Sequence, residues 1–486
     1  MVKKLLCVFL SVVLCFAFVA CNGGSDGNSG KNSGNTPSGE AVSVKVVGKG
    51  FGKEWMENIA SAYYEETGTQ VYVSEDPDLT SNLLTLMNNK GSEKEDIYFV
   101  GHSVDQFIKW IRQGSIESID DVLASDKYGP SAKSRVIDQN ILGMGEYKGK
   151  TYLTSYTNSA WGLIYNQSYL DKIDSYGEYK KGEWPETVQG LIDLCKVTKA
   201  ANLTNNRTKR TVAPFSCGLT VDYMDWLYHG LWYELDPEGY DAYYQYSDVN
   251  GGYPGDKLVT GAAKQALETI YDLIDPKVAT DDKGKSYVDN NLVASAQNHM
   301  QSQQSFVNGD CVFTFSGSWF GTEMKQILSE VGLTEYHFGA YPVYNKGDKT
   351  VVPMNLPGEM FFIPSDAINV SGAKDFLAFV LSEKGVAAAE KALQFPMVYS
   401  TSEKVEFNSF GKEIVALTEK SNLIYRFAKS DVFRTKALEI FTCEGVASPF
   451  IRMARNEVKR ENLTHDILDV EKAYHVGLWS EWMKKI

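Results

Sequence analysis

Three glycines at positions 48, 50 and 52 follow a predicted strand and precede a predicted helix, which is the setting of a dinucleotide-binding turn. That chemistry needs its third glycine at position 53, where the chain has Lys53. No Gly-Lys-Ser/Thr phosphate loop occurs in the sequence. We therefore interpret 48–52 as a glycine-rich turn and expect no nucleotide cofactor.

The sequence also lacks a complete motif for hydrolysis or for metal binding. The chain has six His and no HExxH, and the segment 316–321 has the wrong spacing for a GxSxG nucleophile turn. The segment that starts at Asp248 resembles a calcium loop, but Val259 stands where a Glu is needed. No local pattern nominates a carboxylate pair among the 62 acidic residues, so a surface glycosidase stays an alternative. We expect no catalytic residue, no metal and no cofactor.

Composition narrows the possible partners. The 486 residues include 48 basic and 62 acidic side chains, a net charge of −14, which argues against nucleic acid as a partner. Hydrophobic residues make up 43% of the chain, so a large core is expected. Aromatic residues make up 12%, with 28 Tyr and 9 Trp, which suits an aromatic-lined site, although most buried rings belong to ordinary cores.

The N-terminus predicts export and lipid attachment. Residues 1–20 have the pattern of a signal peptide, because two Lys precede an apolar run that is shorter than the roughly 20 residues of a spanning helix. The run ends in 18–21, which resembles a bacterial lipobox with Phe18 in place of the usual Leu and implies lipidation, including palmitate, at Cys21. A retained membrane anchor is the alternative. The Gly-, Ser- and Asn-rich stretch that follows, up to residue 41, predicts a flexible tether.

Strands and helices alternate from residue 42 onward. We expect strands at 42–47, 70–73 and 96–100, and helices at 53–66, 79–88 and up to 113. Strands separated by helices form parallel sheets, and ligands bind beyond the carboxyl ends of such strands. Residues at or near those ends are Phe51, Glu75, His102 and Asp105.

The second half is richer in aromatic residues. Tyr223 and Trp226 are three residues apart and could share one face of a helix, where core packing competes with ligand binding. We expect a loop over 236–257 because of its Gly and Pro content. Other expected elements are listed here: extended pieces within 150–166, strands at 311–319, 338–343 and 360–364, helices at 185–202, 373–381 and 386–393, and mostly helix from 402.

Four segments, in this order, resemble the family-1 extracellular solute-binding proteins of bacterial ABC importers, the maltodextrin-binding type. They are the lipobox with its tether, the strand 96–100, the stretch from Tyr147 to Asn166, and the strand and turn 309–319; the segment 358–381 then looks like the return crossing. No one motif is specific, and their order and spacing carry the resemblance. The chain departs from the family pattern in the bulky residues at 311–313 and in the Tyr-rich stretch 236–257, and these departures bear on the ligand more than on the fold.

The resemblance implies a two-lobed, periplasmic-binding-protein-like fold with open α/β sheets. It implies three interlobe crossings, near 154–158, 357–362 and 395–401. One lobe would hold 42–155 with 359–398, and the other 156–358 with 399–486. The ligand would be gripped between the lobes by hinge closure.

The resemblance also implies the function and several site residues. The chain would be a lipid-anchored monomer on the outer face of the cell membrane that delivers a carbohydrate, an oligosaccharide, to permease subunits, without chemistry. Trp161 and Trp319 should then face the cleft, and Asn158, Glu359 and Met360 lie at crossings where a hinge role competes with ligand contact. A binding protein for peptide or another polar solute remains an alternative.

Overall fold

The structure is a computed structural model that describes residues 41–48, 50–101, 105–219, 221–244, 246, 251–288, 298–355, 358–425, 438–443 and 445–484. The predicted signal peptide, Cys21 and nearly all of the predicted tether lie outside the described residues. Among the helices that are described, none is both long and apolar enough to cross a membrane.

The first sheet has five strands in the order β2-β1-β3-β12-β6. Strand β1 is parallel to β2 and β3, whereas β12 is antiparallel to β3 and β6. The parallel sheet predicted for the first part of the chain is therefore confirmed, with a return strand from far along the sequence set between β3 and β6. The bounds are β1 Val42–Val46, β2 Val71–Glu75, β3 Ile97–Val100, β6 Thr154–Ser155 and β12 Met360–Phe362.

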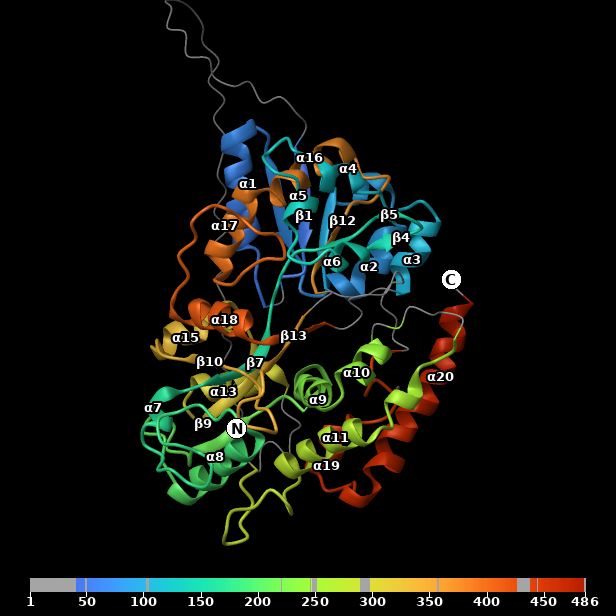
Figure 1. Ribbon diagram of the computed structural model, residues 1–486. Helices are drawn as coiled ribbons and strands as arrows, with labels where there is room; N and C mark the ends of the chain where they lie inside the picture. Colours follow the sequence, from blue (N-terminus) through green and yellow to red (C-terminus); the bar gives the residue numbers. More distant parts are fainter. Residues whose placement is uncertain are drawn as a thin grey trace, which may run out of the picture. The chain divides into compact units, whose positions relative to one another are not determined.

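Helices from both ends of this part of the chain pack around the first sheet (Figure 1). Helix α1 (Glu54–Thr67) lies beside α17 (Glu383–Leu393) and ends, as predicted, at Gly68 with a φ of 75°. The remaining elements of this region are α2 Leu79–Asn88, α3 Asp105–Arg112, α4 Asp120–Ala124, α5 Ala132–Arg135, α6 Asn140–Gly143, α16 Val370–Val380 and the hairpin strands β4 Glu146–Tyr147 and β5 Lys150–Thr151.

The second sheet has four strands in the order β10-β7-β9-β8. Strand β7 is antiparallel to both β9 and β10, and β8 is parallel to β9. All seven residues of β9 are buried, as their apolar run predicts. A separate pair, β11 and β13, runs parallel. The bounds are β7 Trp161–Tyr165, β8 Ala213–Ser216, β9 Cys311–Gly317, β10 His337–Gly339, β11 Val351–Met354 and β13 Asn422–Tyr425.

Helix α9 (Val221–Leu235) packs against α10, α11 and β11 in the second region (Figure 1). It carries Tyr223 and Trp226 on its first turns, which places both predicted aromatics on one helix. The other helices of this region are α7 Gln167–Leu170, α8 Val188–Ala201, α10 Pro237–Tyr244, α11 Gly261–Ile274, α13 His299–Val307, α14 Phe320–Glu323, α15 Lys325–Val331, α18 Ser409–Lys420, α19 Pro449–Ala454 and α20 Asp469–Met483.

The loop expected over 236–257 is wrong for its first part, which forms α10. Tyr240, Tyr243 and Tyr244 fall at helical spacing and pack their rings 5.2, 5.7 and 6.1 Å from the ring of Trp232. Burial of these aromatic faces outweighs the turn signals of the glycine and proline residues. The region after 402, expected to be mostly helical, also contains the strand β13.

Three segments meet near the edge of the first sheet. The Tyr156 N–H donates to the Glu359 carbonyl at 3.2 Å, and the Val398 N–H donates to the Tyr156 carbonyl at 3.0 Å. Thr157 pairs with Met397 in an isolated antiparallel bridge. The first of the three predicted crossing regions is thus hydrogen-bonded to each of the other two.

Arg135 fixes the third of these segments. Its guanidinium donates to the carbonyls of Ser400, Pro130 and Leu381, and its side chain is buried. An apolar replacement would leave these carbonyls without their donor, which costs about 1–3 kcal/mol for each buried group.

We expect Arg135→Met to lower the free energy of unfolding by about 2–4 kcal/mol because buried carbonyls lose their hydrogen bonds. The matched control is Arg455→Met, a substitution at an exposed position. It should change the free energy of unfolding by less than about 0.5 kcal/mol. Urea unfolding measures both. Equal effects of the two substitutions would contradict this role of Arg135.

Candidate functional site

Four buried polar atoms within 155–161 have no hydrogen-bond partner among the described residues. They are the Ser155 Oγ, the Asn158 Oδ1, the Ser159 Oγ and the Trp161 Nε1. A buried polar atom without a partner costs about 1–3 kcal/mol, so proteins rarely keep several together without a use. The segment that carries them joins the first sheet to the second, and its unpartnered polar atoms make it a candidate for binding a polar ligand.

Four of the predicted aromatic residues form one cluster beside this segment. The Trp161 ring lies 4.5 Å from that of Trp319, 5.2 Å from that of Trp226 and 5.1 Å from that of Tyr223. Trp226 is stacked on Trp161, while Tyr223 and Trp319 meet it edge-on. The rings come from the start of β7, from α9 and from the turn after β9, so three elements build one aromatic wall.

Two glycines make room for the Trp319 ring. A Cβ on Gly317 would lie 2.2 Å from the Trp319 Cζ3, and a Cβ on Gly50 would lie 3.3 Å from its Cδ1. Gly317 pairs with Trp161 between β9 and β7, which sets the register of the cluster. The turn after β1 therefore lies directly against the aromatic cluster of the second sheet.

The site residues predicted at the strand ends of the first sheet do not form a comparable cluster. Phe51 is buried and its ring lies 5.8 Å from that of Phe395. Glu75 is exposed, and its Oε1 occupies the space where a Cβ on Gly48 would fall, 2.0 Å away. His102 lies outside the described residues, and so does the side chain of Asp105 at the start of α3.

Glu359 and Met360 differ in setting. The Glu359 Oε2 accepts a hydrogen bond of 2.6 Å from the Thr157 Oγ1, and burial raises the pKa of this carboxyl above its ordinary value of 4.5, with the Thr157 bond opposing. Met360 is 2% exposed in β12, where it pairs with Val100 and Ser155. Glu359 thus offers a polar group near Asn158, whereas Met360 belongs to the core of the sheet.

A polar chain behind the aromatic cluster was not predicted. The Ser316 Oγ donates to the Gln303 Oε1 at 3.1 Å, and the Gln303 Nε2 donates to the Glu323 Oε2 at 2.7 Å. The Glu323 Oε1 lies 3.8 Å from the His299 Nε2, and the His299 ring stacks on Tyr223 at 5.0 Å. Burial raises the pKa of Glu323, and hydrogen bonding to Gln303 is the main opposing effect. His299 and Gln303 share α13, whereas Ser316 lies on β9 and Glu323 on α14, and no local motif joins these elements.

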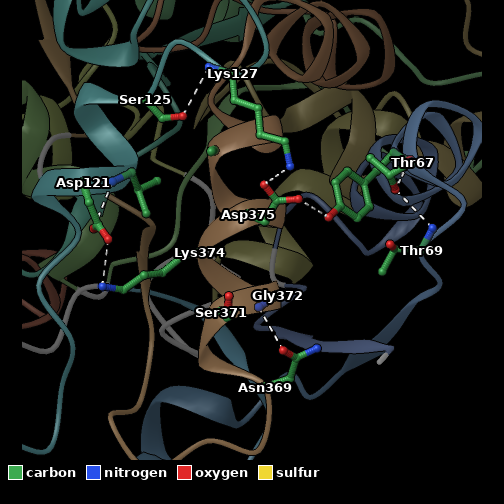
Figure 2. A pocket seen from close by; sticks show the side chains of 13 residues that line it. Thr67, Thr69, Asp121, Ser125, Lys127, Asn369, Ser371, Gly372, Lys374 and Asp375 are labelled. Carbon is green, nitrogen blue, oxygen red and sulfur yellow. Dashed lines mark hydrogen bonds and ion pairs between the residues drawn. The ribbon is translucent and has the colours of Figure 1, made fainter. Parts of the chain in front are cut away.

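A cavity of about 610 Å³ lies between α1, α4 and α16 (Figure 2). None of the predicted site residues lines it. Figure 2 shows its charged groups already engaged: Lys127 pairs with Asp375 at 2.5 Å, and Lys374 pairs with Asp121 at 3.1 Å. Burial would raise the pKa of Asp375, but hydrogen bonds from Lys127, Tyr63 and Tyr128 outweigh it and lower the pKa. We interpret this cavity as a surface hollow around a structural network.

The described residues contain no cluster of three or more His, Cys, Asp or Glu side chains that could hold a metal ion. The site therefore offers aromatic faces, neutral hydrogen-bonding groups and carboxylates. Such groups bind a polar molecule that has apolar faces.

A family model described as bacterial extracellular solute-binding protein matches residues 58–408. No curated protein sequence matches the chain. Among solved structures, the raffinose complex of RafE, a protein of Streptococcus pneumoniae, is 15% identical with a TM-score of 0.58 over 91% of this chain and 99% of RafE. A chitin oligosaccharide binding protein is 15% identical, with a TM-score of 0.59 over 87% and 95%. The GacH receptor of Streptomyces glaucescens, studied with acarbose, is 15% identical, with a TM-score of 0.60 over 92% and 98%. At these identities the likeness is one of fold, and the expected two-lobed α/β fold is confirmed.

We expect Glu359→Gln to stabilise the chain at neutral pH. A folded-state pKa above the ordinary value means that the stability due to protonated Glu359 is full below 4.5 and is lost as the pH rises through the folded pKa. The variant cannot ionise, so it should match the wild type at pH 4 and unfold at a higher temperature than the wild type at pH 7. Thermal unfolding at both pH values measures this.

A second variant checks the cause. Thr157→Val removes the donor to Glu359 and should destabilise the chain more at pH 7 than at pH 4, since a bond to a charged acceptor is lost. If neither difference depends on pH, the buried carboxyl is not the titrating group.

Proposed function

The chain belongs to the bacterial extracellular solute-binding protein family, and we propose that it binds a carbohydrate, an oligosaccharide, between its two lobes and delivers it to the permease of an ABC importer. Binding would close the lobes about the three crossing segments. The closed form would then be the one that the permease recognises.

The observation that carries the proposal is the aromatic cluster beside the buried polar atoms of 155–161. A sugar presents C–H-rich faces and a rim of hydroxyl groups. The faces suit the rings of Trp161 and Trp319, and the hydroxyls suit the oxygens of Ser159 and Asn158 and the indole N–H of Trp161. The raffinose, chitin-oligosaccharide and acarbose named for the similar structures support the same ligand class.

We assign different roles in ligand binding to the residues of the predicted site. Trp161, Tyr223, Trp226 and Trp319 would form the stacking wall, and Asn158 and Glu359 would hold ligand hydroxyls at the crossings. Phe51 and Glu75 would close the site from the first sheet. We also propose His102 and Asp105, near the strand ends of the first sheet, and Met360, at the second crossing, as ligand contacts.

We propose that the ligand is released unchanged. Glu359 and Glu323 are half-buried, and the carboxyl of each accepts a hydrogen bond from a neutral side chain, Thr157 or Gln303. That arrangement orients a carboxylate to accept hydrogen bonds. Reversible binding without a metal or a cofactor is the expected behaviour.

The remaining parts of the proposal rest on the sequence. We divide the chain into lobes of 42–155 with 359–398 and of 156–358 with 399–486. The protein would be a monomer, exported by the signal peptide 1–20 and tethered to the outer face of the cell membrane through a lipid on Cys21.

Calorimetric titration with raffinose and chitin oligosaccharides tests the ligand class. Trp319→Ala should weaken binding at least about tenfold, or about 1.4 kcal/mol, because a stacking face is lost. The matched control is Trp184→Ala, because the Trp184 ring stacks on that of Tyr165 at 4.6 Å, near the same sheet but outside the cluster. The affinity of this variant for the sugar should be unchanged. Equal losses in both variants would remove Trp319 from the site. Binding of short peptides but of no sugar would overturn the carbohydrate assignment, and sugar cleavage would overturn the role without chemistry.

Cys21→Ser tests the anchor. The variant should lose all incorporation of radioactive palmitate in growing cells, because the acylated sulfur is absent. Cys15→Ser, within the predicted signal peptide, should keep the label. Label retained in Cys21→Ser would contradict lipidation at this position.

A further inference from the structure

A second cavity, of about 410 Å³, lies on the first sheet's side of the molecule, between the end of α3 and the β4–β5 hairpin. Figure 1 shows these three elements next to one another. It is lined by Ile111, Arg112, Tyr147, Lys148, Lys150 and Tyr152. None of the residues assigned to the sugar site lines it, so it is a separate feature of the chain.

The hairpin geometry gathers these side chains on one face. Tyr147 stands opposite Lys150 in the β4–β5 register, so their side chains share a face, and Tyr152 follows Lys150 by two residues. Glu146 pairs with Thr151 and so belongs to the opposite face. The half-buried tyrosine rings pack on the core and form a floor, and the exposed cations surround it.

The turn of the hairpin carries a strained cation. Lys148 has a φ of 52° and Gly149 a φ of 77°, a pair of left-handed residues for which Asn-Gly is the preferred sequence. A residue with a Cβ, such as Lys, is disfavoured in this conformation, where glycine is preferred. The Lys148 Nζ lies 5.3 Å from the centre of the Tyr147 ring, over the floor of the cavity.

The charge of the cavity is opposite to that of the chain. The net charge of the whole sequence is −14, yet among the described residues that line this cavity three are basic and none is acidic. Within the described part of the chain, neither Lys148 nor Lys150 forms an ion pair with a carboxylate. Ordinary surface lysines are scattered and solvated, whereas these surround a concave aromatic floor.

We propose that this cavity binds a phosphate-bearing group. A phosphate monoester carries up to two negative charges and three terminal oxygens, so it can accept from more than one of the cationic side chains that line the cavity. A carboxylate has only two oxygens and one charge, which makes it the weaker occupant. The phosphate could belong to a soluble monoester or to an anionic phospholipid headgroup. The headgroup phosphate is a diester with two terminal oxygens and one charge, but a membrane surface presents several of them side by side, so both sources offer the cations more than one anionic oxygen.

Calorimetric titration of the full chain tests the proposal with three probes: inorganic phosphate, glycerol 3-phosphate and acetate. The two phosphates should bind more tightly than acetate and more weakly as salt is raised. Lys148→Glu/Lys150→Glu should weaken phosphate binding at least about tenfold. The control with the same charge change, Lys346→Glu/Lys349→Glu on the exposed loop between β10 and β11, should leave it unchanged.

Sedimentation with vesicles distinguishes the two sources. Preference of the wild type for phosphatidylglycerol over phosphatidylcholine vesicles, lost in the Lys148/Lys150 variant but kept in the control, would assign the phosphate to a lipid. Binding of glycerol 3-phosphate without that vesicle preference would assign it to a soluble ester. No response to any phosphate probe, equal binding of acetate, or equal affinity in the two double variants would overturn the proposal. Lys150→Gln, a milder change, repeats the test if the double variant does not fold.

Discussion

Both sheets depend on the backbone hydrogen bonds that join residues 156 and 159 to residues 355, 359 and 398. Tyr156 is bonded to Glu359 and Val398, and the Asn355 N–H donates to the Ser159 carbonyl at 2.8 Å. These bonds fix where β6 ends and where β7 begins, only six residues later. This connection is short and is hydrogen-bonded to two other segments. Its backbone therefore has little conformational freedom, and its side chains keep fixed positions. Arg135 extends the same restraint to the third segment through Ser400.

The aromatic cluster uses that restraint. Trp161 starts β7 and is in register with Gly317, whose missing side chain lets the Trp319 ring fold back over the strand. The polar chain from Ser316 to His299 then supports the cluster from behind, because His299 stacks on Tyr223 and Glu323 follows Trp319 by one helical turn. Rings held in this way lose little rotamer freedom when a ligand arrives, which favours binding.

Local signals in the sequence were sufficient for much of the fold. Gly68 ends α1 because its left-handed φ suits glycine, and the apolar spacing of 79–88 predicts α2 at its observed bounds. Trp161 and Trp319 could be nominated only through a family resemblance, since nothing in their own sequence surroundings separates a ligand-binding ring from a core ring. Helix α10 was not predicted because its tyrosine rings are buried against Trp232 of another helix, and that contact cannot be seen in the local sequence. The polar chain was missed for the same reason: Gln303, Ser316 and Glu323 lie on different elements, and only the folded chain aligns them.

The antiparallel strand β12 has a consequence for the order in which the molecule can assemble. It comes from residues 360–362 but sits between β3 and β6, which are complete by residue 155. A chain emerging from the ribosome therefore carries β1, β2 and β3 long before the strand that joins them to β6 exists. The edge of β3 that pairs with β12 therefore stays unpaired while all the strands of the second sheet are synthesised. Contacts so distant in sequence form slowly, so a newly made chain stays incompletely folded for longer than one whose sheets are built from neighbouring strands.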